Sequence, residues 1–388
     1  MDFRFTEEQI ALYEGARAFG RAEVHPGVLE RDKNCTFSRE IWKKMGDHGL
    51  LGAPYPVEYG GTGLSAVETC LVSEGFAEGA EDGGTTLAWG ASTILCGVPI
   101  WKLGSEEHKR RYLPAMSSGE LIGGFCLSEP DSGSDAASMK TRAVKKGNKW
   151  ILNGTKMWIT NGPVGGVFVV TAVTDPTARP KAAGISTFLV ESSFPGFKVG
   201  QHIEKMGMKT SLTSELVFED CEVPEENLLG IENYGFIMSV KLILGWERSC
   251  LLAPGMGGMK ATIDRTAKYL QERHQFGRPI AKFQALRHML AQMKMDYELS
   301  RNLIYRVAWQ LDRDGDPPLV DAAIAKLFLS ETSQRCFRDA IQMHGGNGFT
   351  TEYHVERSLR DSMISTIGGG TSEVQRGIIA RSILDLGF

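Results

Sequence analysis

The sequence predicts an α+β fold built from three consecutive parts. Apolar residues recur at helical spacing from about residue 6 to 120. Short β-branched runs separated by Pro, Gly and Asn replace this pattern from about residue 122, and long helical patterns return from about residue 236. A chain of 388 residues is long enough for two or three domains. We therefore expect a helical domain over 1–121, a β domain over 122–235 and a helical bundle over 236–388.

The first helical part begins with a recognisable start signal. Thr6 and Gln9 have the spacing of a capping box, and Ile10, Tyr13 and Phe19 follow at helical spacing. The segment 36–50 predicts a second amphipathic helix that ends at the Gly-rich stretch LLGAPYPVEYGGTGLS. More helix is expected through residue 120, with breaks at Gly and Pro.

The β part is predicted from alternation and turn residues. The run 143–153 alternates and contains Gly147-Asn148, which is typical of a hairpin turn. Further strands are expected in VGGVFVVTAV, GISTFLVE, GFKVGQ and SELVFEDCEVP. In the last part, apolar positions such as Leu286, Leu290 and Met293 are expected to form the core of long antiparallel helices.

Composition limits the possible functions. Hydrophobic residues make up 42% of the chain and charged residues 23%, which is ordinary for a folded globular protein. The net charge of −4 offers no general basic field for nucleic acid, and the acidic, amphipathic start MDFRFTEEQIALYEG does not resemble a signal peptide. Seven dispersed Cys without a CxxC pair and eight dispersed His without HxxxH predict reduced thiols, a cytoplasmic location and no metal site.

Four stretches are locally unusual and are candidates for a binding site. FCLSEPDSGSD (125–135) is rich in hydroxyls, Gly and Asp at the expected domain boundary, where pockets form readily, although a capped turn explains it equally well. KMWITNG (156–162) places Trp158 at a strand end, where it either covers a flat ring or, as the pattern favours, plugs the domain junction. RHQFG (273–277) and QMHGGNGF (342–349) end predicted helices with features that helix termini commonly use.

A fifth stretch, IGGGTSEVQR (367–376), repeats the glycine theme at the start of the last predicted helix. Two Gly-rich helix junctions about twenty residues apart suggest backbone N–H groups directed at an anion such as a pyrophosphate. Each stretch is a weak signal alone.

Taken together and in this order, these motifs resemble those of the acyl-CoA dehydrogenase superfamily over essentially the whole chain. The resemblance rests on FCLSEPDSGSD, ILNGTKMWITNG, MGMKTSLTSELVFEDCEVPEENLLG, RHQFGRPIAKFQ, IQMHGGNGFTTEYHVERSLRD and IGGGTSEVQR. It implies an N-terminal α domain, a middle β-barrel or β-sandwich domain and a C-terminal four-helix bundle. It also implies bound FAD and a homotetramer built as a dimer of dimers.

The resemblance also implies roles for individual residues. The flavin ring would be lined by Phe125, Leu127, Ser128, Gly133 and Ser134 on one side and covered by Trp158 and Thr160 on the other. Thr371 and Glu373 would hold the same FAD, whereas Arg273, Gln275, Phe276, Gln342, Gly345 and Gly346 would reach the FAD of a neighbouring subunit. Phosphates suit Gly-rich backbone donors and Arg, and a flat ring suits an aromatic wall.

The implied reaction is oxidation of an acyl thioester at Cα–Cβ, in which a carboxylate removes the α-proton and a hydride leaves Cβ for flavin N5. Many members place the base, a Glu, in a Y-E-G-T pattern, but here that position is Gly369. A minority branch, including isovaleryl- and long-chain-type enzymes, uses Glu in an E-R pair on a bundle helix, and Glu247-Arg248 fits that pattern. We therefore expect Glu247 to be the base, the alternative being a structural salt bridge, and Gly369 to offer its backbone N–H to the thioester oxygen.

The substrate is less well defined by the sequence. Ser134, Trp246, Arg248 and Gly370 are the candidate substrate contacts, and Trp246, Trp89 and Trp101 hint at a restricted pocket. GAPYPVEYGGTGLSAVETC, VPIWKLGS and WERSCLLAPGMGG resemble the branch that acts on carrier-protein thioesters, so a carrier-bound substrate is slightly favoured over CoA. A short- or branched-chain acyl-CoA dehydrogenase of catabolism, a flavin monooxygenase or oxidase, and a catalytically silent member are the alternatives.

Two partners follow from that assignment. Electrons would pass to an electron-transfer flavoprotein or another acceptor. An acidic carrier could dock on Lys109, Arg110, Arg111, Arg142, Lys145 and Lys146, although charge runs of this kind are usually solvated surface.

Overall fold

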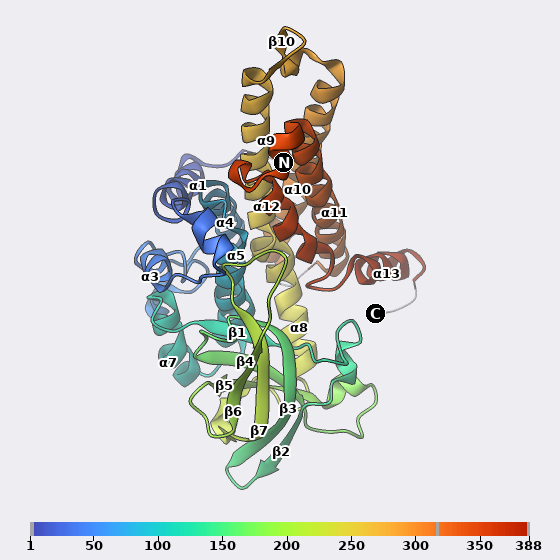
Figure 1. The fold of residues 1–388 in the computed structure, drawn as a ribbon. Coiled ribbons are helices and arrows are strands. Elements are labelled where there is room, and N and C mark those ends of the chain that lie inside the picture. The colour runs from blue at the N-terminus through green and yellow to red at the C-terminus, as the bar shows by residue number, and fades with distance from the viewer. Residues whose placement is uncertain (1–3, 316–317, 386–388) are drawn as a thin grey trace.

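The computed structural model describes residues 4–315 and 318–385, without the side chains of 239–241. Two helical parts lie side by side, and a twisted sheet lies below them (Figure 1). The predicted order of helical, β and helical parts is therefore correct.

The N-terminal part is helical, as expected. Its α-helices are α1 (Glu7–Phe19), α2 (Val28–Lys33), α3 (Arg39–Asp47), α4 (Ala66–Ala80), α5 (Gly83–Trp89), α6 (Val98–Leu103) and α7 (Glu106–Ser117). The predicted capping box is present, because Thr6 accepts from Gln9 N and the Gln9 side chain accepts from Thr6 N. Between α5 and α6 the chain widens into a π-helix over Gly90–Gly97, and π-turns of this kind often occur at functional sites.

The middle part is one sheet. Its strands are β1 (Gly123–Cys126), β2 (Arg142–Lys146), β3 (Lys149–Thr160), β4 (Val167–Val173), β5 (Ile185–Glu191), β6 (Phe197–His202), β7 (Thr213–Pro224) and β8 (Leu228–Leu229). Their order is β6-β7-β3-β2-β4-β5-β8, with β1 paired in parallel to β4. The predicted hairpin joins β2 and β3, which pair antiparallel up to Lys146 and Lys149.

The C-terminal part is a bundle of long helices. It comprises α8 (Gly235–Trp246), α9 (Ala253–Glu272), α10 (Gln284–Asp314), α11 (Leu319–His344), α12 (Val355–Ser362) and α13 (Ser372–Ile383), with a short hairpin of β9 (His274–Gln275) and β10 (Arg278–Pro279) between α9 and α10. Of the predicted core positions, Met293 is fully buried, whereas Leu286 and Leu290 are partly buried and pack against the core.

One apolar core joins the two helical parts, while the sheet has its own core around Phe168 and Phe188. Helix α4 packs against α9, and the lower end of α8 approaches the sheet (Figure 1). None of the described helices is long and apolar enough to cross a membrane.

Candidate active site

The first two unusual stretches lie next to each other in the structure. The backbone N–H of Met157 on β3 donates to the carbonyl of Ser128, which follows β1, over 2.9 Å. Along the first stretch, Phe125, Leu127 and Ser128 are half-buried, whereas Gly133 and Ser134 are exposed. The first stretch contains a turn, in which Glu129 and Ser132 exchange backbone hydrogen bonds, and it is joined to β3. We refer to these two joined stretches as the wall.

Trp158 stands out from this wall. The pairing of β3 with β7 shifts register between Lys156 and Ile159, and Trp158 within this bulge has a φ of 65°. A β-bulge redirects a side chain, and the indole is 59% exposed. The favoured interpretation of Trp158 as a plug of the domain junction is therefore wrong. Asn161 occupies the junction instead, donating to Ala88 O and Gly123 O over 2.9 Å each.

A buried ion pair joins the two stretches behind this wall. Lys156 Nζ donates to Glu129 Oε1 over 2.9 Å and to Leu127 O over 3.0 Å. Glu129 also accepts from the backbone N–H groups of Lys140 and Thr141. Both charges are satisfied although their side chains are nearly inaccessible, which is the condition for keeping a buried pair.

The glycine loop before α13 is shaped by positive dihedrals and by one amide side chain. Gly369 and Gly370 have φ of 65° and 85°, a conformation that favours glycine. Gln375 Nε2 donates to the carbonyls of Gly369 and Gly370 over 3.2 and 3.0 Å. Thr371 caps α13 by accepting from Val374 N, while Glu373 is exposed in the first turn.

Glu247 lies directly against this loop. A Cβ placed on Gly369 would be 2.7 Å from Glu247 Oε1, a distance that real Cβ atoms do not adopt. Glu247 starts a π-turn over Glu247–Leu251 between α8 and α9. A side chain at Gly369 would therefore have to displace the carboxylate that approaches it from the bundle.

The surroundings of Glu247 are unusual for a structural carboxylate. It forms no ion pair within 4 Å with any described side chain, which argues against the structural salt bridge. Its side chain keeps some opening to solvent, yet enough protein surrounds the carboxylate that burial raises the pKa of Glu247. The positive charges of Arg248 and Lys326 oppose that rise in pKa.

Arg248 is buried beside the loop with spare donors. Only 3% of its surface is exposed, and its Nε and Nη1 atoms have no hydrogen-bond partner among the described residues. Its Nη2 atom is 3.8 Å from where a Cβ on Gly370 would be. Buried donors left unpaired are costly, so this guanidinium is suited to an additional acceptor at the loop.

Two of the three tryptophans expected to restrict the pocket lie together. Trp246 and Trp101 pack edge to face with ring centroids 6.0 Å apart, and Lys102 Nζ lies 3.4 Å from the Trp101 ring centre. Trp89 differs, because it is buried in the core and donates to Leu50 O over 2.9 Å.

The third and fourth unusual stretches meet in a second place. Arg273 and Gln275 from the end of α9, and Gln342, Gly345 and Gly346 from the end of α11, line one pocket of about 350 Å³. Its floor contains Tyr269 stacked on His344 at 4.2 Å. The nearby hairpin turn Phe276-Gly277 leaves the Phe276 ring 90% exposed.

These two places lie at opposite ends of the bundle. The 20 residues of α9 separate the π-turn of Glu247 from Arg273, a length of about 30 Å at 1.5 Å per residue. Figure 1 shows the β9–β10 hairpin at the far end of α9 and α10, away from the sheet and α13. Within one chain, the predicted cofactor residues therefore form two separate surfaces.

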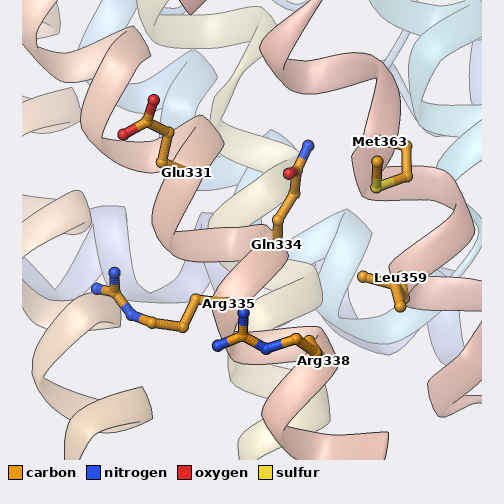
Figure 2. Close-up of a pocket in the computed structure, with 6 residues that line it drawn as sticks. All are labelled: Glu331, Gln334, Arg335, Arg338, Leu359 and Met363. Carbon is orange, nitrogen blue, oxygen red and sulfur yellow. The ribbon is translucent and has the colours of Figure 1, made fainter.

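A further groove of about 420 Å³ contains none of the predicted site residues. Glu331, Gln334, Arg335 and Arg338 of α11 line one side, and Leu359 and Met363 line the other (Figure 2). Gln334 also donates to Ser362 O and Thr366 Oγ1, so this groove lies behind the turn that leads into the glycine loop.

The basic residues expected to form a docking surface are largely neutralised. Lys109 and Arg110 pair with Glu106, Arg111 with Glu191, and Lys145 with Glu225. This leaves little net positive charge there, which weakens the docking hypothesis. Among the described residues, no group of three or more His, Cys, Asp or Glu side chains could hold a metal ion.

Two residues of the site were missed in the sequence. Lys326 lies in the apolar run AAIAKLF, where a lysine at a buried helical position was the available signal. Gln375 lies within IGGGTSEVQR itself, but nothing in its spacing shows that its amide turns back to the loop carbonyls.

Comparison with known proteins identifies the family. The acyl-CoA dehydrogenase N-terminal, middle and C-terminal domain models match residues 6–120, 124–221 and 233–384. Mitochondrial isovaleryl-CoA dehydrogenase of Pongo abelii is 41% identical over 97% of this chain and 89% of its own length.

Two solved structures are similarly close. The prolyl acyl carrier protein oxidase AnaB is 34% identical with a TM-score of 0.95, covering 98% of this chain and 100% of its own. PigA with FAD and proline is 33% identical with a TM-score of 0.96 over 100% of both chains. The chain therefore belongs to the acyl-CoA dehydrogenase family, whose members are FAD-dependent oxidoreductases that act on CH–CH bonds.

Proposed function

We propose that this protein dehydrogenates an acyl thioester to the enoyl thioester, with Glu247 as the base that removes the α-proton. The observation that carries the proposal is the contact between the Glu247 carboxylate and the space that a Gly369 side chain would fill. Burial raises the pKa of this carboxylate, which makes it a stronger base than an exposed Glu. It also lies free of any ion pair with the described side chains.

The remaining residues at the loop bind and polarise the thioester in this proposal. The α-proton passes to Glu247 Oε1 or Oε2, and the electron pair of that C–H bond becomes part of the new Cα=Cβ bond. The Gly369 backbone N–H donates to the thioester oxygen, where negative charge develops. Ser134, Trp246, Arg248 and Gly370 surround the acyl group, and the Trp246–Trp101 pair favours a short acyl chain.

The two separate surfaces fit the two chemically different parts of FAD. Half-buried Phe125, Leu127 and Ser128, with exposed Trp158 and half-buried Thr160, suit the flat ring. Thr371 and Glu373 are assigned to the same FAD at the start of α13. When bound, FAD supplies the acceptor for the hydride that leaves the substrate β-carbon.

The far pocket suits the phosphates of a second FAD held by another copy of this chain. Arg273, Gln275, Phe276, Gln342, Gly345 and Gly346 are assigned to that contact. Adding a Cβ to Gly345 or Gly346 would meet nothing within 4 Å, so the backbone there is open to a ligand. A homotetramer, with electron-transfer flavoprotein or another protein as acceptor, completes this proposal.

The thioester handle is proposed to be a carrier protein, supported by the similarity to AnaB. A catabolic acyl-CoA dehydrogenase of the isovaleryl-CoA type is the second candidate, favoured by the similarity to that enzyme. Loading one acyl group onto CoA and onto a carrier protein, and comparing turnover, separates the two. Equal or better turnover of the CoA ester would overturn the carrier assignment.

The base assignment is tested by mixing the FAD-loaded enzyme with acyl thioesters without oxygen and following flavin absorbance. Glu247→Gln should slow bleaching about 10²–10⁴-fold, whereas Glu298→Gln, an exposed carboxylate on α10, should not change it. Equal bleaching by wild type and Glu247→Gln would exclude Glu247 as the base. Reduction only by NAD(P)H or a reductase would indicate an oxygenase instead.

A further inference from the structure

Lys326 on α11 is a buried cation that local hydrogen bonding does not explain. Its side chain is 2% exposed, and its Nζ donates to the carbonyl of Ser365 over 2.7 Å. Ser330 Oγ donates to that same carbonyl over 2.8 Å, so the carbonyl already has a neutral donor. Lysine is almost never fully buried unless paired, and Lys326 has no ion pair within 4 Å among the described side chains.

The carbonyl that Lys326 contacts lies in the turn that precedes the glycine loop. Ser365 lies in the 3₁₀ turn Met363–Thr366, which leads directly to Gly368–Gly370. Gln334 of the same helix holds this turn at both ends, through Ser362 O and Thr366 Oγ1. Helix α11 therefore sets the position of the loop from behind, while Glu247 contacts Gly369 from the π-turn.

The charge of Lys326 also reaches the base. The groups whose charges act on Glu247 are Arg248 and Lys326, and those that act on Lys326 are Glu247, Arg248, Glu331 and Glu373. Burial lowers the pKa of Lys326 to about 8, so the side chain is still cationic at pH 7. It stabilises an ionised Glu247 without forming the close ion pair that would block the carboxylate.

We propose that Lys326 is a positioning residue for proton abstraction: anchored on Ser365 O behind the glycine loop, it places a positive charge that favours the ionised form of the Glu247 carboxylate. The inference depends on the proposed role of Glu247 and adds to it a second cation, besides Arg248, that shifts the working pH range of that base. A neutral residue at position 326 leaves Glu247 protonated at a higher pH.

The test compares Lys326→Met, Lys326→Arg and Ser330→Ala in the FAD-loaded enzyme. The rate of flavin bleaching by an acyl thioester is followed from about pH 5 to 9 without oxygen. On the acidic side of the profile, the rate falls as Glu247 becomes protonated, and we call this fall the acid limb. For Lys326→Met, the acid limb should lie about one pH unit higher than in wild type. The variant should then be about tenfold slower at pH values below the limb and nearly as fast as wild type above it. Ser330→Ala removes a donor to the same carbonyl without changing charge, and Lys326→Arg keeps the charge, so both should keep the wild-type limb.

A second readout does not depend on turnover. Infrared difference titration of each protein against its Glu247→Gln counterpart follows the carboxyl C=O stretch of Glu247 directly. The pH midpoint of the Glu247 titration should be higher in Lys326→Met than in wild type and should be unchanged in Ser330→Ala. Lys326→Gln replaces Lys326→Met if the latter does not fold.

The inference is overturned if Lys326→Met and Lys326→Gln keep the acid limb of the wild-type rate and the wild-type titration midpoint of Glu247. It is also overturned if Ser330→Ala shifts the limb and the midpoint as far as the Lys326 variants do. If Glu247→Gln bleaches as fast as wild type, the proposed function fails instead, irrespective of the Lys326 variants.

Discussion

The two glycine-rich junctions of the bundle have opposite surroundings. A Cβ on Gly369 would collide with the protein's own Glu247 carboxylate, whereas a Cβ on Gly346 would meet nothing within 4 Å. At the first junction glycine makes room for an internal side chain, and at the second it leaves the backbone open to something outside the chain. Glycine therefore faces a side chain of the same chain at Gly369, whereas at Gly346 it leaves a space that no described residue fills.

The largest expected effect follows from filling the space at Gly369. Gly369→Ala places a Cβ 2.7 Å from Glu247 Oε1 and also strains a φ of 65°. The carboxylate is the mobile partner and should move aside, and a displacement near 1 Å costs about 10²-fold in rate. Flavin bleaching per bound FAD measures this loss.

Gly346→Ala is the matched control for that substitution. It introduces the same methyl group at the open junction, so the bleaching rate per bound FAD should stay within about twofold of wild type. If Gly369→Ala and Gly346→Ala lost bleaching rate to a similar extent, the contact between Gly369 and Glu247 would not matter for catalysis.

A second contrast concerns the stability contributed by a buried and by an exposed ion pair of the sheet. Lys156→Met leaves the Glu129 carboxylate buried without its cation, and breaking a buried pair in this way costs about 3–5 kcal/mol. Lys198→Met removes the cation of an exposed pair with Glu219 and should cost less than about 1 kcal/mol. Denaturant unfolding measures both, and equal costs would show that the Lys156–Glu129 pair does not hold the wall.

Substitution in the pocket at the open glycine junction is expected to change the affinity for FAD. Arg273→Ala removes a charged donor from the far pocket, and a hydrogen bond to a charged group contributes about 1.5–3 kcal/mol, or about 10–100-fold in FAD affinity. Fluorescence titration of the apoprotein with FAD gives the affinity. Arg278→Ala, on the same hairpin but stacked on Phe283, is the control and should leave the affinity nearly unchanged. Unaltered affinity in Arg273→Ala would remove this pocket from the cofactor site.

The smallest expected effect is on the pH dependence of stability. The pKa of Glu247 is raised in the folded protein, so the folded state is favoured when the group is protonated and loses stability as pH rises above the ordinary Glu value of 4.5. Glu247→Gln mimics the protonated form. Its melting temperature relative to wild type should therefore increase from pH 4 to pH 8, by a few degrees at most. A difference that stays constant with pH would contradict the raised pKa.

Much of this molecule could be predicted from local pattern. The three parts, the capping box at Thr6 and the hairpin at Gly147-Asn148 depend on periodicity and turn chemistry within a few residues, and all are present. Trp158 was misjudged because its exposure depends on a bulge formed against β7, and strand alternation does not reveal a bulge.

The site shows the same division. The sequence pointed to Glu247 and Gly369 through the family resemblance, in which an E-R pair on a bundle helix and a vacant position in the loop stand out. Only the tertiary structure decided that these residues touch and that Gln375 and Lys326 support the loop. The Lys326–Ser365 and Glu247–Gly369 contacts join segments from tens to more than a hundred residues apart, and packing rather than local propensity sets which of them meet. The Gln375 contact is local, but the backbone turn that brings its amide to the loop carbonyls is not visible in the residue spacing. The sequence therefore determined which chemical groups this protein has, and the fold determined where their charges act.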